Sequence, residues 1–426
     1  MCQSTLSKLF HAKTWLLACL SALVLVFSYN VSALNLKLAE QLALTDDPMV
    51  KSYLASSRAF DEQSIVDNTL PDPQFRLGLF NLPVDTFSTT QEPSTQLRLG
   101  VQQAFPKGDS LQYKQQQSRW LSKSSLAQAD DENLKIIRDL REVYLNLYYE
   151  LQTEKIIKNN RALFTSLVKI TEAHYAAGRV KQQDVLQADL ELSRLEDRLV
   201  KTLGKQDEYR AALRQWIGEL AYQTMDEKLP VLPVIPDTTD INSLLIKHPA
   251  VVMQAAKVNA SRSTIAIAKQ GYRPGLNAFV EYRKRFGENP DGSDRADMLA
   301  AMVTLDIPLF TANRQDKQVS ANIEKTSAAQ FQLDNKLRVL KRLLEKDLAV
   351  YKRLGQRQKL YHEELLASAK NNAEASLRAY QSGVTEFTTL MRSRMTELDV
   401  KLADLRVRVD RSRAKARLLY LTGEAK

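Results

Sequence analysis

Proline is missing from two long parts of this 426-residue chain, residues 107–229 and 309–426, although the sequence contains 13 prolines elsewhere. Glycine is also scarce, with 13 residues in the whole chain. Because proline breaks helices and glycine weakens them, both absences favour very long helices over a loop-rich enzyme. Helices of that length are better suited to spanning a distance than to enclosing a reaction.

Cysteine is almost absent, and both cysteines, Cys2 and Cys19, lie in the first twenty residues. This segment has the features of a secretory signal peptide: Lys8 and Lys13 precede an apolar run over 15–27, which is too short for a comfortable transmembrane helix. Small residues follow at 31–33. We therefore predict a signal peptide over residues 1–33 and a mature chain without thiols or disulfides. The sequence around Cys19 also resembles a lipoprotein box, so lipidation of Cys19 stays open.

Residues for catalysis or metal binding are also lacking. The four histidines are not spaced as metal ligands, and neither a phosphate-binding glycine loop nor a Ser/His/Asp elbow occurs. We expect no enzyme activity, no cofactor and no metal site. His248, which precedes a proline, is predicted to begin a helix, and the acidic run 130–132 is predicted to be a solvated helix face. The net charge is +10, but Lys and Arg are dispersed among nearly as many acids, so we expect no nucleic-acid partner.

Two sets of residues recur at a fixed interval. Tyr175 and Gly178 recur as Tyr380 and Gly383, 205 residues later, and the Gly-Glu pair at 218–219 recurs at 423–424 with the same offset. The chain is therefore predicted to be a duplicated unit. We divide it into a signal peptide (1–33), a first repeat (34–218), a proline-containing connector (219–247) and a second repeat (248–426).

Each repeat contains two segments of alternating apolar and mostly polar residues, about ten residues long, the length that a tilted strand needs to cross an outer membrane. A soluble hairpin with one face on a core is the alternative. The signal peptide and the adjoining long helices favour the membrane. The apolar positions are Phe75, Leu77, Leu79, Leu97, Leu99, Val101, Leu276, Ala278, Val280, Tyr282, Leu299, Ala301, Val303, Leu305 and Ile307; inward polar residues would include Arg76, Arg98, Asn277 and Glu281.

Pro106 and Pro308 are each predicted to end a strand and to start a helix. A continuous helix from there to Tyr175 or Tyr380 would be roughly 100 Å long. Apolar residues recur every three or four positions along these segments, as over 136–151 and 333–351, which predicts packing against neighbours along the whole length. Gly178 and Gly383 are expected to end the helices in a left-handed conformation, and 183–184 to cap the returning helix of the first repeat. Each repeat is thus a strand hairpin attached to a long helical hairpin.

The chain resembles the TolC family of outer-membrane efflux channels. The resemblance rests on the paired Tyr-x-x-Gly turns, on Asp184-Val185-Leu186 and on the glycines Gly218 and Gly423 that end the repeats, together with His248-Pro249 and the prolines after the strands. It covers nearly the whole mature chain. The phrase at 70–73, with 81–83 after it, is similar to the heavy-metal cation-efflux branch of the family.

The resemblance implies a mixed, mainly α fold. Long helical hairpins would form a periplasmic barrel, and four transmembrane strands per chain would contribute to a twelve-stranded β-barrel of a homotrimer in the outer membrane of a Gram-negative bacterium. Its partners would be a periplasmic adaptor protein, outer-membrane lipid and an inner-membrane pump, with an RND-type pump favoured over an ABC-type one. The implied function is a passive duct for small solutes, drugs or metal cations. The alternatives are ATP-driven protein secretion and a periplasmic coiled-coil scaffold without a pore.

The resemblance also assigns residues to two sites. The helical tips would dock the adaptor, and the periplasmic entrance would be constricted by a tyrosine and nearby charged residues. Thr385, Thr389 and Arg392 stand where the best-known members have an arginine and two acids, so the charged network of the entrance stays open. The tip residues are Ala176, Ala177, Gly178, Arg179, Val180, Gln381, Ser382, Gly383, Val384 and Thr385; the constriction residues are Tyr380, Asp184, Glu386 and Arg392.

Overall fold

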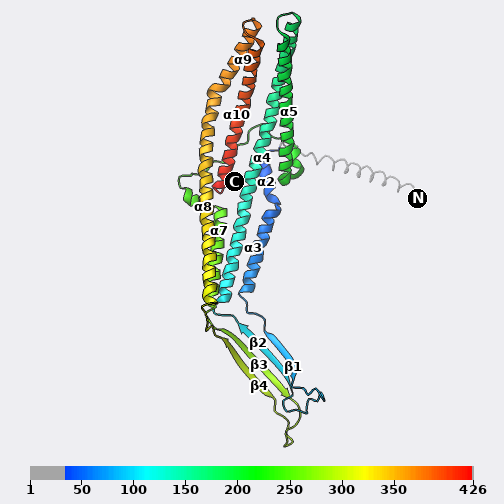
Figure 1. The fold of residues 1–426 in the computed structure, drawn as a ribbon, viewed down its shortest axis with the longest axis vertical. Helices are drawn as coiled ribbons and strands as arrows, with labels where there is room; N and C mark the ends of the chain where they lie inside the picture. Colours follow the sequence, from blue (N-terminus) through cyan, green and yellow to red (C-terminus); the bar gives the residue numbers. More distant parts are fainter. Residues whose placement is uncertain (1–33, 425–426) are drawn as a thin grey trace, which may run out of the picture.

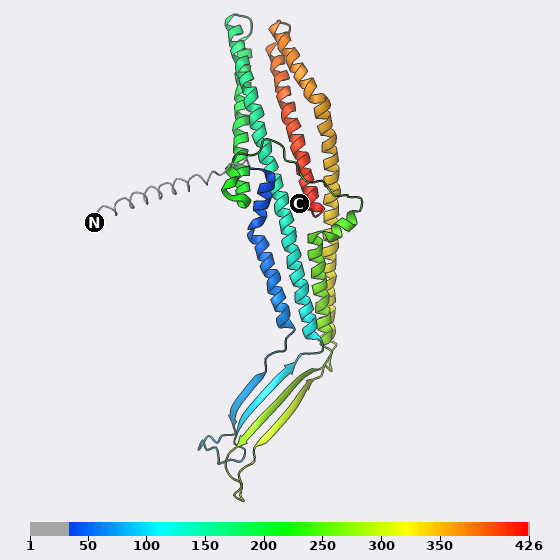
Figure 2. The same cartoon turned by 180° about the vertical axis from the view of Figure 1, so that it is seen from behind.

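The structure is a computed structural model that describes residues 34–424. The predicted signal peptide, its cleavage after Ala33 and the lipidation of Cys19 lie outside the described residues. A four-stranded sheet forms one end of an elongated molecule, two helical hairpins form the other end, and the C-terminus lies at mid-height (Figure 1). The same arrangement seen from behind shows the sheet inclined to the helices (Figure 2).

The two repeats have the same order of elements: a short helix, a longer helix, a strand hairpin and a long helical hairpin. The first repeat consists of α2 (Leu36–Thr45), α3 (Pro48–Asp67), β1 (Gln74–Phe80), β2 (Gln96–Phe105), α4 (Ser110–Ala176), α5 (Gln182–Ile217) and the 3-10 turn η1 (Gly218–Tyr222). The matching short helix α6 (Ile241–Lys247) lies at the end of the segment assigned above to the connector. The second repeat then continues with α7 (Pro249–Gln270), β3 (Gly275–Arg285), β4 (Met298–Asp306), α8 (Gln315–Leu360), the π-turn η2 (Tyr361–Leu365), α9 (Leu366–Gln381) and α10 (Phe387–Leu421).

Equivalent residues begin the second helix of each repeat. The Asp47 carboxylate accepts hydrogen bonds from the backbone N–H groups of Met49 (2.8 Å) and Val50 (3.1 Å) at the start of α3. In the same place before α7, Nδ1 of His248 accepts a hydrogen bond from the N–H of Ala250 (3.2 Å). Both residues satisfy N–H groups that a helix start leaves without partners, and both precede a proline at the first helical position. The prediction that His248 begins a helix is confirmed.

The predicted strands form one antiparallel sheet in the order β1-β2-β3-β4. Their register aligns Arg76 with Gly100 and Glu281, and Leu77 with Leu99 and Tyr282. Directly opposed residues share a face of a sheet. The predicted separation of an apolar face from a mostly polar face is therefore confirmed across all four strands.

The long helices differ between the repeats. Helix α4 contains 67 residues without a break, so it is about 100 Å long. The equivalent rod in the second repeat is interrupted by η2, where the helix widens by one residue. Leu140, Leu147 and Leu344 of the predicted seams are fully buried. Leu186 and Leu190 of α5 are exposed, so one face of this helix has no neighbour within the described chain.

Two predictions about the ends of helices were wrong in detail. Pro106 and Pro308 do not begin helices, since α4 starts at Ser110 and α8 at Gln315. Each proline lies in a connection that turns the chain from the inclined sheet into the helices (Figure 1). Helix α5 starts at Gln182, which places residues 183–184 inside its first turn instead of at the cap position. Asp184 still satisfies a helix-start N–H, that of Lys181, at 3.2 Å.

The acidic run 130–132 is not a uniformly solvated face, contrary to the prediction. Asp130 is exposed, but Asp131 is buried and lies within hydrogen-bond distance of the Tyr420 hydroxyl (3.1 Å) and the Lys135 ammonium (2.8 Å). Sequence periodicity could not reveal this, because the partner comes from the far end of the chain. A buried carboxylate with two partners is a structural tie between the repeats.

Candidate functional site

The two helical tips are built by the same turn. In the first tip, the N–H of Gly178 donates to the carbonyl of Tyr175 (2.9 Å) and the N–H of Arg179 to that of His174 (2.8 Å). In the second tip, Gly383 and Val384 repeat these bonds to Tyr380 (3.1 Å) and Ala379 (2.9 Å). This is the Schellman arrangement that ends a helix through a left-handed residue, and φ is 70° at Gly178 and 73° at Gly383. The predicted helix-ending role of both glycines is confirmed.

Most residues of both tips are open to solvent. Of the ten predicted tip residues, only Val180 and Thr385 are half-buried, and the other eight are exposed. Val384 is 80% exposed at the end of the second hairpin. The tips therefore present a small, mainly uncharged surface at the end of the molecule farthest from the sheet (Figure 1).

A cleft of about 620 Å³ lies between the two tips. It brings together three of the four predicted constriction residues, namely Asp184, Tyr380 and Glu386. Arg392 does not line it. Arg392 instead lines a neighbouring cleft of about 530 Å³ together with Glu191 and Asp399. The clefts are lined by residues from both hairpins, so the distance between the hairpins sets their width.

Tyr380 lies between the hairpins and is only 7% exposed. Its ring packs against Phe387 at 5.7 Å between centroids and against His174 at 5.8 Å. Its hydroxyl lies 3.4 Å from Nδ1 of His174, and burial raises the pKa of the phenol. The equivalent Tyr175 in the first repeat is exposed. The duplicated tyrosines thus have different surroundings: Tyr380 lies between the two hairpins, whereas Tyr175 is open to solvent.

Two residues at this end were not singled out from the sequence. His174 meets Tyr380 across the cleft, although its position next to Tyr175 could have drawn attention to it. Further from the tip, Arg198 of α5 and Asp399 of α10 form an ion pair at 2.7 Å. Both side chains are substantially exposed, and the pair joins the two hairpins. An exposed ion pair of this kind contributes less than about 1 kcal/mol to stability. It therefore adds little to the packing of the two hairpins against each other.

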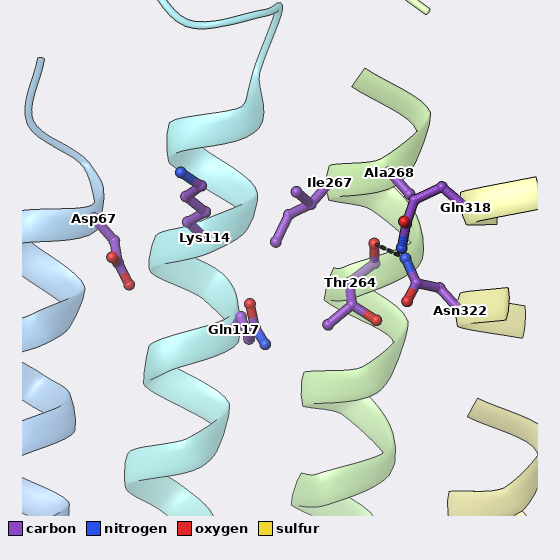
Figure 3. Close-up of a pocket in the computed structure, with 8 residues that line it drawn as sticks. All are labelled: Asp67, Lys114, Gln117, Thr264, Ile267, Ala268, Gln318 and Asn322. Carbon is purple, nitrogen blue, oxygen red and sulfur yellow. Dashed lines mark hydrogen bonds between the residues drawn. The ribbon is translucent and has the colours of Figure 1, made fainter. Parts of the chain in front are cut away.

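A further cleft of about 440 Å³ lies where α3, α4, α7 and α8 approach the sheet (Figure 3). Asp67 and Lys114 are the charged residues that line it. Asp67 accepts a hydrogen bond from Ser118 (2.5 Å), and the Asn322 amide donates to the backbone carbonyl of Thr264 (3.3 Å; Figure 3). These bonds fix side chains along the line where helices of the two repeats meet.

Within residues 34–424, no group of three or more His, Cys, Asp and Glu side chains is placed to hold a metal ion. None of the helices in this part of the chain combines the length and the hydropathy needed to cross a membrane.

Comparison with known proteins identifies the family. The sequence profile of the outer membrane efflux proteins matches residues 41–219 and 241–424, most of the chain. The chain therefore belongs to the outer membrane efflux protein family, the TolC family that the sequence resembles. No sequence among curated proteins matches the chain.

Solved structures show the same fold at low sequence identity. The outer membrane protein VceC from Vibrio cholerae has a TM-score of 0.77 and 16% identity, over 91% of this chain and 96% of that one. The CmeC outer membrane channel of Campylobacter jejuni has a TM-score of 0.76 and 14% identity, over 91% and 85%. CusC has a TM-score of 0.77 and 13% identity, over 91% and 92%.

These findings confirm the predicted fold class: mainly α, internally duplicated, with long helical hairpins and a four-stranded contribution to a β-barrel. The family is one of outer-membrane efflux channels and not of enzymes, and membership places this chain in the outer membrane.

Proposed function

We propose that three copies of this chain form a passive duct that carries small solutes from the periplasm across the outer membrane. The observation that carries the proposal is the sheet. Its strands β1 and β4 each pair on one side only within the described residues, and its apolar face is open, with Phe75, Leu77 and Leu299 each about three-quarters exposed. A bare apolar face is stable against lipid and not against water, and open strand edges are tolerated in lipid only when other chains close the sheet into a barrel.

The helices support the same assembly. Leu186 and Val200 of α5 and Phe331 of α8 are exposed apolar residues far from the strands. Rods about 100 Å long need neighbours along their length, and two further copies of the chain would supply them. In a ring of three chains the helices enclose a tunnel in the periplasm, and each chain contributes four strands to a shared twelve-stranded barrel.

A direct experiment is to purify the mature chain from membranes and to measure its mass in detergent and its conductance in planar bilayers. The proposal predicts a heat-modifiable trimer that conducts ions. A water-soluble monomer that never conducts would overturn it and would favour a periplasmic scaffold without a pore.

We propose that the tips dock a periplasmic adaptor, which connects the duct to an inner-membrane pump. The exposed Ala177 and Val384 are suitable positions for a test, because the mature chain predicted from the sequence has no cysteine. Ala177→Cys and Val384→Cys should each form cross-links to a periplasmic adaptor protein of the same bacterium. Val231→Cys is the matched control, because Val231 is 94% exposed but lies in the connector. This variant should form no cross-link to the adaptor. Equal cross-linking from all three positions would argue against docking at the tips.

We propose that the cleft between the tips is the constriction of the duct. Tyr380 would set its width by joining the two hairpins. Asp184 and Glu386 would supply charge within the cleft, and Arg392 would supply charge from the neighbouring cleft. Tyr380→Ala and Asp184→Ala should each raise single-channel conductance. Tyr380→Phe keeps the ring packing and is the control, with conductance close to that of the original chain. Unchanged conductance in both alanine variants would refute the constriction.

A further inference from the structure

The polar face of the sheet carries a cluster of arginines at its outer end, the end nearer the strand-connecting loops. Arg98 and Arg283 are directly opposed in the register, and Arg76 lies one row nearer the helices, in line with Glu281. Arg285 is one row farther out, opposite Gln96. These four residues, which we call the arginine belt, occupy three successive rows of one face. Three such rows span roughly 13 Å along a strand.

Few acids offset the belt on that face. Glu281 is the only carboxylate in the three rows, and it is buried between Arg283 (2.5 Å) and Arg98 (3.9 Å). Asp306 is the other acid on the polar face, and it lies at the inner end of β4, where Lys107 pairs with it at 2.6 Å. Four cations and one acid leave a formal charge of +3 per chain in the belt.

Neutral contacts hold two of the belt's guanidinium groups in place. Arg76 donates to Oε1 of Gln102 (2.6 Å) and lies 5.4 Å from the centre of the Phe279 ring, and Arg98 lies 4.1 Å from the centre of the Phe80 ring. Within residues 34–424, no carboxylate lies within ion-pair distance of Arg76. Rings orient a guanidinium without neutralising it. The charge of the belt therefore remains available to a solute.

The opposite face of the sheet has no comparable charge. Lys284 is the only charged residue of the four strands on that face, and it pairs with Asp297 in the loop. The acids of the two strand-connecting loops lie beyond the strands, so an incoming or leaving ion meets them before or after the belt; they are Asp85, Glu92, Glu288, Asp291, Asp294 and Asp297. Cations are thus gathered on the face that would line water in a closed barrel.

We infer that the arginine belt makes the outer part of the duct selective for anions, so that the preferred solutes carry carboxylate, sulfate or phosphate groups and free metal cations are disfavoured. The inference rests on the proposed function, because it requires that the polar face lines a lumen. Three chains would place a formal charge of +9 around one opening. A lumen lined by one sign of charge within low-dielectric walls concentrates ions of the opposite sign.

The experiment measures the reversal potential of the reconstituted protein in a KCl gradient, followed by block from the loop side with sucrose octasulfate or spermine. The unaltered chain should prefer chloride and be blocked by the polyanion alone. In Arg76→Gln/Arg98→Gln, which keeps hydrogen-bond donors, the chloride-to-potassium permeability ratio should fall by about threefold or more and polyanion block should weaken. Lys284→Gln removes one positive charge from the opposite face of the same sheet and should leave both quantities unchanged.

A channel that prefers potassium, or one whose selectivity and block are the same in the double variant, overturns the inference and leaves the proposed duct intact. Heat-modifiable trimers in each variant show that the barrel has formed. A failure of every variant and of the unaltered chain to conduct contradicts the duct itself, and the inference with it.

Discussion

His248 and Tyr420 are 172 residues apart in sequence, and Nε2 of His248 donates a hydrogen bond to the backbone carbonyl of Tyr420 at 3.0 Å. Because Nδ1 of the same ring accepts a hydrogen bond from the N–H of Ala250, the imidazole must be neutral and protonated at Nε2. The two rings also meet edge to face, 5.1 Å apart. One buried histidine thus begins α7 and fixes the end of α10.

This arrangement predicts a loss of stability in mild acid. Burial lowers the pKa of His248; the backbone hydrogen bond to Tyr420 and the charge of Asp131 oppose that shift, and the charges of Lys336 and Lys135 add to it. The unfolded chain takes up a proton near pH 6.5, whereas the folded chain does so only at lower pH. The contribution of His248 is therefore complete above about pH 6.5 and is lost as the pH falls towards its folded pKa. Guanidinium unfolding midpoints at pH 7.5 and 5.5 measure it.

His248→Asn is the matched control, since asparagine also caps helices but does not titrate. The decrease in midpoint between the two pH values should be smaller in this variant. An identical decrease would show that other groups cause the acid sensitivity.

The hydroxyl of Tyr420 is predicted to stabilise the tie between the repeats. It donates to the buried Asp131, whose other partner is Lys135. Tyr420→Phe removes a hydrogen bond to a charged group, so the free energy of unfolding should fall by about 1.5–3 kcal/mol. Tyr222→Phe, at a half-exposed position, should change it little. Equal effects of the two substitutions in denaturant titrations would contradict a special role for the Asp131 contact.

Arg417 is predicted to be the strongest charged link among three helices. It donates to Glu142 of α4 (2.9 Å) and to the buried Asp347 of α8 (2.9 Å). Arg417→Met would leave the Asp347 carboxylate buried without this partner. The free energy of unfolding should therefore fall by about 3–5 kcal/mol. The double variant Arg417→Met/Asp347→Leu should recover much of the lost stability, because no charge then remains buried at that position. A double variant as unstable as the sum of its singles would be inconsistent with this explanation.

The turn glycines are predicted to be required for their backbone conformation and not for lack of space. An added Cβ at Gly178 or Gly383 meets no atom within 4 Å, but both residues have positive φ. An alanine at either position should lower the stability of that tip by about 1–2 kcal/mol. Gly204 in α5 also has open space around it but has helical φ, so Gly204→Ala should stabilise the chain by about 0.5–1 kcal/mol. Amide hydrogen exchange measures both changes: it should become faster at the tip in the Gly178 or Gly383 variant and should not in Gly204→Ala. The same change in exchange rate in all variants would contradict a conformational role for the turn glycines.

Local patterns in the sequence were sufficient to predict the elements of the fold. The alternation over the four strands fixed both faces of the sheet, because a strand has a strict two-residue period. The recurrence of Gly178 as Gly383 located both tips, since each position needs a left-handed residue. These features depend on neighbours a few residues away, which a sequence displays directly.

Contacts between distant segments could not be predicted in this way. The burial of Asp131 depends on Tyr420, and the burial of Tyr380 depends on how closely the second hairpin approaches His174 of the first. Pro308 was expected to begin a helix, but the angle between the sheet and the helices requires a longer connection. Neither charge runs nor helical periodicity contain information about these relative positions.

The π-turn at Tyr361–Leu365 makes the two hairpins unequal, since α4 continues without a break while its counterpart changes its helical path before the tip. In the proposed ring of three chains, the six hairpins around the axis would otherwise be nearly interchangeable. With one interrupted rod in each chain, straight and bent hairpins must alternate around the ring. The opening at the periplasmic end then has three-fold but not six-fold symmetry, and an object that binds there meets two distinct kinds of groove.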